Sequence, residues 1–549
     1  MEFKKNQIVE LYIDDIGNEG EGIGHIDGYA LFLKDAVIGD KVRAKIIKTK
    51  KNYGFARVEE VIEASKDRVS PRCSKARQCG GCTLQHLAYE KQLEYKFNKV
   101  KNCLERIGGL ENIEEKMEPI LGMEEPFYYR NKAQFPVGYD KEGNLITGFY
   151  AGRTHHIIDC THCMIQHPVN EQILLKVLDY MKKNNITAYD EKTHKGLVRH
   201  IVTRVGFKTG EIMVCLVVNG SKKNLRNLEM LVDSLTEVEG MTSICVNINK
   251  EKTNRILGSK IEEVYGKPYI YDYIGNVKYQ IGPLSFFQVN PTQTKVLYEK
   301  AMEYADLKGE ETVWDLYCGI GTISLFLAQK AKKVYGVEIV KEAIDDARLN
   351  AKMNGFDNAE FFVGKAEEVL PREYEKNGVY ADTIVVDPPR KGCDSKLLET
   401  MVKMAPKRIV YVSCDPATLA RDLKVLSEQG YEVEKVCAVD QFSHSSHVET
   451  VVLLSQQKPD DTIEIDLDLD ELDATSAELK ATYQEIKDYV LKEFGLKVSN
   501  LYISQVKRKC GIEVGENYNL PKSENARVPQ CPKEKEDAIK AALKYYAMI

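Results

Sequence analysis

The segment from residue 272 to 456 constrains the fold of this 549-residue chain most strongly, because short strand-like runs alternate there with stretches of helical periodicity. The runs at 313–316, 333–338, 382–387 and 409–412 are short and largely apolar, as buried parallel strands are. Alternation of such strands with helices predicts an α/β domain built on a doubly wound parallel sheet.

Two more strand-like runs, 431–436 and 448–454, stand on either side of a short polar loop, 440–447. A connection of this length cannot hold a helical crossover, so the last strand is expected to run antiparallel to its neighbours. A parallel sheet with such a terminal hairpin resembles the fold of methyltransferases that use S-adenosylmethionine (SAM), and it differs from that of a dehydrogenase.

One cysteine lies at the position where a sheet of this kind binds its ligands. The run 409–412 leads into a Ser-Cys-Asp-Pro turn that contains Cys414, and an amphipathic segment follows. Ligands of open α/β sheets bind at the carboxyl ends of the strands, so Cys414 is expected to lie over the active crevice. A thiol there is a candidate nucleophile, although an arbitrary cysteine is more often a buried structural residue.

Three other strand ends carry residues suited to a nucleoside cofactor. Gly319 and Gly321 follow the first strand and let the backbone close on a ligand at the start of a helix, although Gly-x-Gly alone also fits a dinucleotide. Glu338 ends the second strand as an acid that can hold ribose hydroxyls. An Asp-Pro-Pro-Arg turn at 387–390 follows the fourth. In methylases of exocyclic amino groups an aromatic ring follows the prolines, so Arg390 argues against that reaction.

Three cysteines within ten residues, Cys73, Cys79 and Cys82, form a second feature with its own chemistry. Two glycines between the last pair let the loop turn tightly around a metal centre. Either Cys160 or Cys163 can supply a fourth thiolate, and Cys163 is our assignment. Structural zinc favours closely paired ligands on both sides, whereas one triplet with a single distant cysteine fits a four-thiolate iron–sulfur cluster better. Zinc is the alternative.

Residues 1–62 predict a small β-barrel, because polar and apolar side chains alternate and glycines divide the segment into tight turns. The stretch 41–57 contains seven basic residues and no acidic one, with Tyr53 and Phe55 among them. Cations for phosphates and rings for base stacking make this stretch a candidate RNA surface. A solvated strand face is the alternative.

Composition and charge bound the location and the partners of the chain. No apolar run approaches the roughly 20 residues needed to cross a membrane, and the start lacks the apolar core of a signal peptide, so we expect a cytoplasmic protein. Fourteen cysteines in that reducing compartment indicate metal binding or catalysis rather than disulfides. The net charge of -6 excludes a uniformly basic coat, so RNA would bind through local patches.

Together these features resemble one family, the RNA 5-methyluridine methyltransferases. The motifs that carry the resemblance occur in order at 286–290, 315–319, 387–390, 413–416 and 447–450. With the cysteine loop, and with a first segment that resembles the OB-like TRAM domain of RNA-modifying enzymes, they are most similar to the 23S ribosomal RNA (uracil-5-)-methyltransferase branch. The transfer-RNA branch, which typically lacks the barrel and the cluster, is the first alternative. A non-catalytic RNA-binding factor is the second.

The resemblance implies a mechanism and a set of site residues. Cys414 would add to C6 of a flipped-out uridine, so that C5 can accept the methyl group of SAM, and Glu449 would then remove the C5 proton. The residues implied to contact SAM are Gln288, Tyr317, Gly319, Glu338 and Asp387. Of these, Asp387 is implied to orient the uracil, either in place of contacting SAM or in addition to it. The residues implied to hold the iron–sulfur cluster, expected to be 4Fe-4S, are Cys73, Cys79, Cys82 and Cys163.

The resemblance ends near residue 456, which leaves a multidomain chain of four predicted parts. They are the barrel at 1–62, an α+β central domain with the iron–sulfur loop at 63–271, the Rossmann-like methyltransferase domain at 272–456 and an extension at 457–549. In the extension, Asp460–Asp473 contains eight acidic residues and predicts an exposed linker. A small helical appendage is expected after it, in which Lys507, Arg508 and Lys509 either hold RNA or form a solvated face. The protein is expected to be a monomer.

Overall fold

The computed structural model describes residues 3–152, 154–457, 482–512, 531–546 and 548. The chain forms two compact units, divided between residues 458 and 459. The described part of the first unit is built on four sheets, and that of the second on three helices. Within these described ranges, none of the helices combines the length and apolar character that a membrane crossing requires.

The amino-terminal sheet is the predicted barrel. Its strands are β1 (Ile8–Tyr12), β2 (Asp15–Ile16), β3 (Gly22–Ile26), β4 (Tyr29–Lys34), β5 (Lys41–Thr49) and β6 (Tyr53–Glu63), in the spatial order β1-β5-β6-β4-β3-β2. Because β2 continues β1 after two residues, both ends of that order belong to one stretch of chain and the sheet closes on itself. Leu31, Val42 and Ile46 are fully buried inside it.

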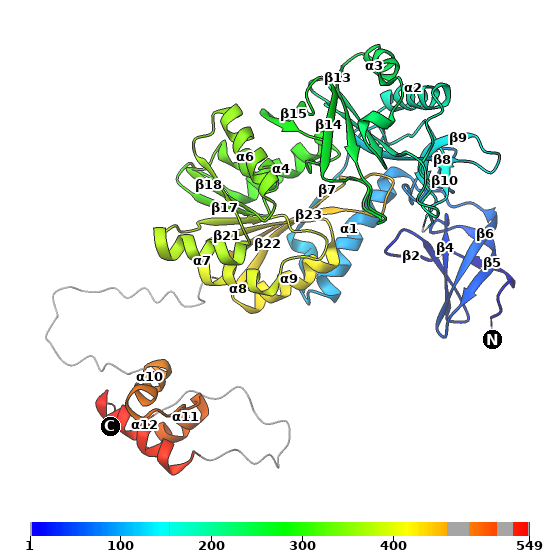
Figure 1. The fold of residues 1–549 in the computed structure, drawn as a ribbon. Coiled ribbons are helices and arrows are strands. Elements are labelled where there is room, and N and C mark those ends of the chain that lie inside the picture. The colour runs from blue at the N-terminus through cyan, green and yellow to red at the C-terminus, as the bar shows by residue number, and fades with distance from the viewer. Residues whose placement is uncertain (1–2, 153, 458–481, 513–530, 547, 549) are drawn as a thin grey trace. The chain divides into compact units, whose positions relative to one another are not determined.

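A seven-stranded sheet follows in the chain. Its strands are β8 (Lys132–Tyr139), β9 (Leu145–Tyr150), β10 (Ile157–Asp159), β11 (Val198–Val205), β12 (Ile212–Val218), β13 (Met241–Ile248) and β14 (Lys260–Tyr265), in the order β10-β9-β8-β11-β12-β13-β14. Helices α2 (Val169–Lys183) and α3 (Leu228–Thr236) share one hydrophobic core with this sheet (Figure 1). The chain segments that precede and follow this sheet in the sequence form the largest sheet of the structure.

The largest sheet contains the predicted doubly wound core. Its strands are β7 (Met117–Leu121), β17 (Thr312–Leu316), β18 (Lys333–Glu338), β19 (Ala359–Val363), β20 (Thr383–Val386), β21 (Arg408–Ser413), β22 (Tyr431–Val439) and β23 (Glu449–Gln456), in the order β19-β18-β17-β20-β21-β23-β22-β7. The five strands from β19 to β21 run parallel, whereas β23 runs antiparallel to β21 and β22. This confirms the expectation drawn from the short loop 440–447.

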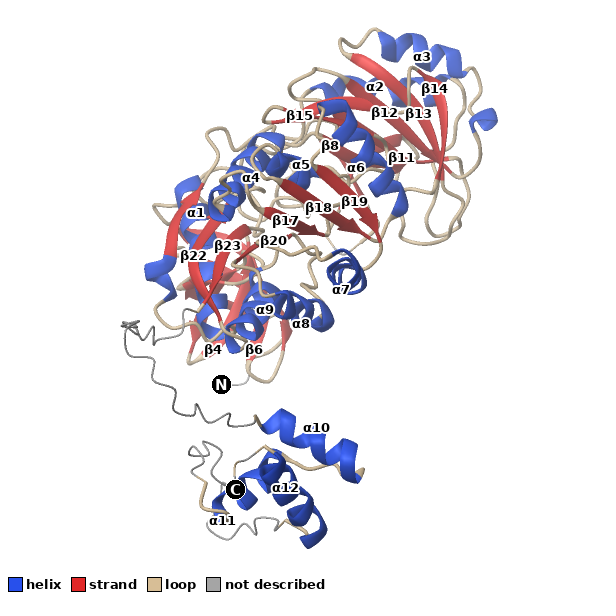
Figure 2. Cartoon of the chain, turned by 90° about the vertical axis from the view of Figure 1, so that its left-hand side faces the viewer, coloured by secondary structure: helices blue, strands red, loops and turns tan. Residues whose placement is uncertain are grey.

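Helices cover both faces of this sheet (Figure 2). One face carries α4 (Pro291–Ala305), α5 (Thr322–Ala328) and α6 (Lys341–Asn354). The other carries α1 (Tyr89–Arg106), α7 (Ala366–Asn377), α8 (Ser395–Met404) and α9 (Pro416–Glu428). Burial on both faces explains why the parallel strands are largely apolar.

Two of these elements come from the segment before the seven-stranded sheet. The outermost strand, β7, pairs in parallel with β22, and α1 packs against α9. Residues 89–121, which the sequence analysis assigned to the central domain, thus belong to the layers of the methyltransferase sheet. The chain returns to that sheet through the hairpin of β15 (Ile270–Ile274) and β16 (Val277–Ile281). Two short 3-10 helices lie at Ile113–Lys116 and Lys222–Asn224.

The second unit consists of α10 (Tyr483–Phe494), α11 (Asn500–Lys509) and α12 (Lys533–Tyr545). Apolar residues from all three helices form one core, in which Val490, Ile503 and Ile539 are fully buried. This is the helical appendage expected from the sequence. The predicted acidic linker, Asp460–Asp473, lies outside the described residues.

Candidate active site

The loops after four parallel strands gather the predicted site residues at one edge of the large sheet. Tyr317 follows β17, Glu338 ends β18, Asp387 follows β20 and Cys414 follows β21. Because these strands are parallel, their carboxyl ends lie at the same edge, which is where open α/β sheets bind ligands. The sheet order reverses between β17 and β20, and Asp387 follows β20 at this switch point, where open α/β sheets bind their ligands.

Cys414 lies between the end of β21 and the start of α9. The Asp415 side chain caps α9 by accepting hydrogen bonds from the backbone N–H groups of Ala417 and Thr418, at 3.0 and 3.1 Å. Burial, followed by the charges of Glu449 and Asp387, raises the pKa of the Cys414 thiol to about 11. The Arg390 guanidinium opposes this effect. The thiol is half-buried and thus still reachable.

Glu449 begins β23, next to the strand that delivers Cys414. Ser413 and Thr450 are register partners across the antiparallel pair, so the next step of that register sets Cys414 opposite Glu449. Only 4% of Glu449 is exposed. Burial raises the pKa of its carboxyl to about 8, Asp387 adds to the shift and Arg390 reduces it. A carboxyl in this state can exchange a proton near neutral pH.

Two buried aspartates lie near Glu449 or near each other. Burial, followed by the charge of Asp315, raises the pKa of Asp387 to about 7. Asp315 is itself fully buried, and burial raises its pKa to about 7 as well. Its Oδ2 atom accepts a hydrogen bond from the Ser324 hydroxyl at 2.5 Å, while its Oδ1 atom has no partner among the described residues. Asp315 is not among the residues predicted from the sequence, although it begins the motif that contains Tyr317 and Gly319.

The loop after β17 is shaped to approach a ligand. Tyr317 has φ +84°, a left-handed conformation that is unusual for a residue with a side chain, and its N–H donates to Val337 O at 3.0 Å. Gly319 has φ +55°, and a Cβ atom added there would meet nothing within 4 Å. The backbone therefore faces open space at Gly319.

Three of the residues predicted to contact SAM are held by different parts of the structure. The negative charge of Glu338 raises the pKa of Asp315, so Glu338 lies near this buried aspartate. Tyr317 lies toward Cys393, whose charge adds to the effect of burial in raising the pKa of the tyrosine. Gln288 is nearly buried, and its backbone carbonyl oxygen accepts a hydrogen bond from the Asn131 side-chain amide at 3.0 Å.

The loop 440–447, which leads into Glu449, is anchored by α1. Lys96 and Asp440 are both fully buried, and their Nζ and Oδ1 atoms lie 2.5 Å apart. Tyr89 donates to the other carboxyl oxygen of Asp440 at 2.7 Å. His444 is also buried, with φ +63°, and its ring packs at a tilt against that of Phe127, at a centroid distance of 4.3 Å. Burial lowers its pKa to about 4, so it packs as a neutral ring.

A row of cations and rings borders this loop. Arg390 approaches His447 at 3.5 Å, the ring of His447 meets that of Phe442 edge-on, and the Arg130 guanidinium lies 6.0 Å from the Phe442 ring centre. Near Arg130, burial and the charges of Arg204 and Arg130 lower the pKa of Lys132 to about 7. Such a row suits an RNA backbone that passes over the crevice.

The cysteine loop is bonded directly to the loop before Glu449. The N–H groups of Thr83 and Leu84 donate to the His444 carbonyl at 2.9 and 3.0 Å. Burial raises the pKa of Cys82 to about 12 and that of Cys163 to about 11. The charges that raise the Cys82 pKa further come from Cys163, Cys79 and Cys73, so the four thiols lie near one another. In the described part of the chain, no group of three or more His, Cys, Asp or Glu side chains is arranged to hold a metal ion.

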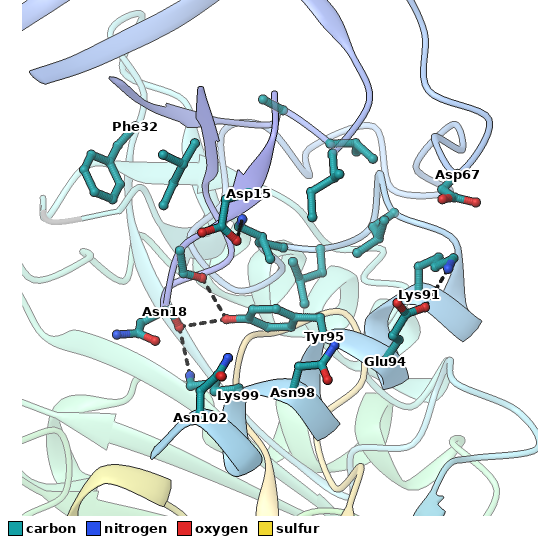
Figure 3. A pocket seen from close by; sticks show the side chains of 18 of the residues that line it. Asp15, Asn18, Phe32, Asp67, Lys91, Glu94, Tyr95, Asn98, Lys99 and Asn102 are labelled. Atoms are coloured by element: carbon teal, nitrogen blue, oxygen red, sulfur yellow. Dashed lines mark hydrogen bonds and ion pairs between the residues drawn. The ribbon is translucent and has the colours of Figure 1, made fainter. Parts of the chain in front are cut away.

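The barrel carries the aromatic residues expected from its sequence, together with a third. Tyr53 and Phe55 are each 39% exposed, and both rings contact Phe32 of the neighbouring strand β4, at centroid distances of 5.7 and 5.8 Å. Phe32 also lines a groove of about 630 Å³ between the barrel and α1 (Figure 3). There Lys99 donates to the carbonyl oxygens of Asn18 and Ser446, at 2.8 and 2.9 Å, which joins the barrel to the loop 440–447.

Comparison with known proteins identifies the chemistry of this architecture. Residues 88–457 match the tRNA (Uracil-5-)-methyltransferase family model, and residues 2–58 match that of the TRAM domain. An uncharacterized RNA methyltransferase of Clostridium tetani is 53% identical over 82% of this chain and 97% of its own length. A second, from Halalkalibacterium halodurans, is 52% identical over the same shares.

A solved structure supports the same assignment. The tRNA (uracil-54, C5)-methyltransferase of Pyrococcus abyssi, in complex with S-adenosyl-L-homocysteine, is 29% identical with a TM-score of 0.66, over 81% of this chain and 100% of its own. The chain described here therefore belongs to the RNA (uracil-5-)-methyltransferase family and is a SAM-dependent enzyme with an amino-terminal TRAM domain.

Proposed function

We propose that this enzyme methylates C5 of a uridine in 23S ribosomal RNA through a covalent bond between Cys414 and C6 of the base. The observation that carries the proposal is the placement of Cys414 and Glu449 at the adjoining ends of β21 and β23. A thiol and a buried carboxyl at one strand edge supply the nucleophile and the base that this reaction needs.

The two residues act in sequence on the uracil ring. The Cys414 thiolate adds to C6, and the electron pair of the C5–C6 double bond makes C5 an enolate-like carbon. SAM supplies, when bound, a methyl group on a sulfonium. When C5 bonds to that methyl carbon, the bond between the methyl carbon and sulfur breaks and a thioether leaves. The Glu449 carboxylate then removes the hydrogen from C5 as a proton. The C5–C6 double bond then reforms, the C6–S bond breaks, and Cys414 leaves as the thiolate.

The charges around the two residues suit these roles. A thiol with a pKa of about 11 is seldom ionised at neutral pH, so the positive charge of Arg390, which opposes that rise, favours the attacking form. The base must then accept a proton, and a pKa of about 8 makes Glu449 basic enough to do so.

SAM would bind at the predicted residues Gln288, Tyr317, Gly319, Glu338 and Asp387. The open space at Gly319 admits a ligand against the backbone, and the free Oδ1 of Asp315 can accept a hydrogen bond from one. Glu338 is a half-buried carboxylate, suited to ribose hydroxyls. Asp387, whose charge acts on Glu449, would orient the uracil as well as contact SAM.

Cys73, Cys79, Cys82 and Cys163 would hold an iron–sulfur cluster, most simply 4Fe-4S. A single zinc ion needs every thiolate about 2.3 Å from one point, whereas a cluster of several atoms accepts thiolates that stand further apart. The support for this assignment is that the charges of Cys163, Cys79 and Cys73 act on Cys82, so the four thiols lie near one another. Because this loop donates hydrogen bonds to His444, the cluster would hold the loop before Glu449 in place.

The choice of 23S rRNA rests on the combination of barrel, cysteine loop and methyltransferase domain, which resembles the ribosomal branch. Transfer RNA is the second candidate, because the Pyrococcus abyssi enzyme that acts on tRNA resembles 81% of this chain, well beyond the methyltransferase sheet alone. Both candidates require base flipping to bring uridine C5 to Cys414.

Transfer of labelled methyl from SAM to unmodified 23S rRNA and unmodified tRNA tests the proposal. We expect label in 5-methyluridine of 23S rRNA, none with Cys414→Ala, and normal activity with the control Cys510→Ala, which alters the second unit. Label in tRNA alone would transfer the assignment to the second candidate. For the cluster, Cys79→Ser should lose bound iron and sulfide while the control Cys103→Ser on α1 keeps them. An unchanged iron content in Cys79→Ser would contradict the cluster.

A further inference from the structure

One loop of the first unit carries positive charge that the proposed mechanism does not use. The loop 249–259 joins β13 to β14, and Lys250, Lys252 and Arg255 are exposed on it, with Glu251 as its one acid. None of the three cations forms an ion pair with a residue that the structure describes. Three unpaired cations on one loop favour a ligand that carries negative charge.

A buried arginine holds this loop in shape. Arg199, on β11, is only 3% exposed. Its guanidinium donates hydrogen bonds to three backbone carbonyls of the loop, those of Asn249, Glu251 and Thr253, at 3.3, 2.7 and 3.3 Å. The Asn249 side chain donates to the Arg255 carbonyl at 2.6 Å. Because its carbonyls are bonded inward, the loop presents its cations from a fixed backbone.

The loop borders a cavity of about 580 Å³ on the central sheet. Arg255 lines this cavity together with Tyr150, which ends β9, and His155. Tyr150 is half-buried and His155 is exposed, and the two ring centroids lie 5.5 Å apart. Small-molecule sites usually measure about 300–1,000 Å³, so the cavity has room for one nucleotide. Rings beside a cation are the groups with which proteins hold unstacked nucleotides.

A histidine in the lining of the cavity lacks hydrogen-bond partners. His200 is only 3% exposed, and neither of its ring nitrogens has a partner among the described residues. Burial lowers its pKa to about 3, so the neutral ring offers one donor and one acceptor. The Tyr150 ring lies edge-on to it at a centroid distance of 6.3 Å. Because buried polar atoms are nearly always paired, the free imidazole favours a ligand with a polar edge beside Tyr150, such as a nucleobase.

The cavity is connected to the catalytic loop through the cysteine loop. Gly80 lines the cavity, and Thr83, three residues further on, donates its N–H to the His444 carbonyl at 2.9 Å. Three residues of chain span at most about 11 Å, and His444 belongs to the loop that leads into Glu449. The cavity therefore lies within reach of an RNA segment whose target uridine enters at Cys414.

We propose that this cavity binds one unstacked nucleotide of the substrate RNA, away from the target uridine, with its base on the rings of Tyr150 and His155 and its phosphate at Arg255. Lys250 and Lys252 attract the adjoining RNA backbone. The inference rests on the proposed function only in that the ligand is the RNA that the enzyme methylates, and it holds for ribosomal and transfer RNA alike. The site adds affinity for RNA and takes no part in the chemistry at C5.

The test uses the full-length enzyme with unmodified 23S rRNA and unmodified tRNA, and it measures filter binding and steady-state methyl transfer. Tyr150→Ala should raise both Kd and KM for the substrate RNA about tenfold, because a stacking ring is lost. Arg255→Gln should raise them about threefold to tenfold, through the lost phosphate contact. In both variants kcat should be retained, as expected when only binding is weakened.

Two further variants separate stacking from folding. Tyr150→Phe keeps the ring and should bind RNA within about twofold of the parent protein. Tyr265→Ala removes an exposed ring from β14 of the same sheet and should also bind within about twofold. Thermal melts of all four variants check that the fold is retained.

Three outcomes would overturn the site. Unchanged RNA affinity in Tyr150→Ala and Arg255→Gln would remove the cavity from the RNA path. An equal loss in Tyr265→Ala would mean that the effect is not specific to the cavity. A lower kcat at unchanged KM would mean that Tyr150 supports the active site rather than RNA. Weaker RNA binding in the cavity variants alone, with no methyl transfer by the parent enzyme, would refute the proposed function and leave this site standing.

Discussion

Cys414 and Glu449 occupy opposite positions where the register of β21 and β23 continues beyond the pair Ser413 and Thr450. The two strands are antiparallel and adjacent in the sheet, although β22 and α9 separate them in the chain. The terminal hairpin of the sheet thus has a role in the chemistry, because it sets β23, which begins with Glu449, beside the strand that leads to Cys414. A fully parallel sheet would not create this pair.

Glu449→Gln should trap the covalent complex between Cys414 and RNA. The amide cannot take the C5 proton, so the C6–S bond persists after methylation. Incubation with SAM and substrate RNA should yield a protein–RNA band that survives a denaturing gel. The double variant Cys414→Ala/Glu449→Gln is the control and should give no band. Free 5-methyluridine RNA at the normal rate from Glu449→Gln would refute the role of Glu449 as the base.

The rate of methyl transfer should rise with pH through about 8. Glu449 has to be ionised to accept the proton, and burial raises its pKa to about 8. Arg390→Gln should shift this rise to higher pH by about half a unit to one unit, because Arg390 favours the ionised forms of Cys414 and Glu449. Single-turnover rates across the pH range measure the shift. The charge-preserving Arg390→Lys should restore much of the profile, and an unchanged profile in Arg390→Gln would argue against this coupling.

The free energy of unfolding should fall as the pH rises from about 4.5 to about 8. Burial raises the folded-state pKa of Glu449 from its ordinary value of 4.5 to about 8, so its contribution is fully present below the lower value and is lost as the pH passes the upper one. Glu449→Gln should therefore be more stable than the parent protein at alkaline pH, by about 1–3 kcal/mol, with little difference near pH 4.5. Urea titrations at both pH values measure this. Greater stability of the parent at alkaline pH would contradict the burial of the charge.

Lys96→Met should destabilise the first unit strongly. It leaves the fully buried Asp440 carboxylate without its cation, which costs about 3–5 kcal/mol in comparable cases. Because Asp440 begins the loop before Glu449, methyl transfer should fall as well. The matched control is Lys341→Met, which breaks the exposed pair with Asp345 and should change the stability little. Equal losses of stability in the two variants, measured by urea unfolding, would show that the buried ion pair contributes no more to stability than the exposed one.

Tyr53→Ala and Phe55→Ala should each weaken RNA binding. Loss of one stacking ring costs about 1–3 kcal/mol where a base lies on it. Filter binding of substrate RNA measures the effect, and Tyr12→Ala, which removes an exposed ring from β1 outside the aromatic group, serves as the control. If all three variants bind RNA equally, the aromatic face of the barrel is not part of the RNA site.

Patterns within a few residues predicted much of the molecule. The period of the apolar residues predicted the strands β17, β18, β20 and β21, and the short loop 440–447 predicted the antiparallel turn of β23. Strand ends also indicated Cys414 and Glu338, because a strand that ends in a polar turn places those side chains at a known edge of the sheet. Local periodicity depends only on neighbours in the chain, so it is readable without the fold.

Contacts between distant segments were decided by the tertiary structure alone. No local pattern pairs β7 with β22, joins Lys96 to Asp440 across 344 positions, or directs two N–H groups of the cysteine loop to His444. The same applies to the cations of α11, where packing buries Lys507, pairs Lys509 and leaves Arg508 exposed. The sequence by itself determined the elements, the family motifs and the chemistry at the strand ends. Burial and charge pairing depend on which segments meet in space, and only the folded topology decides that.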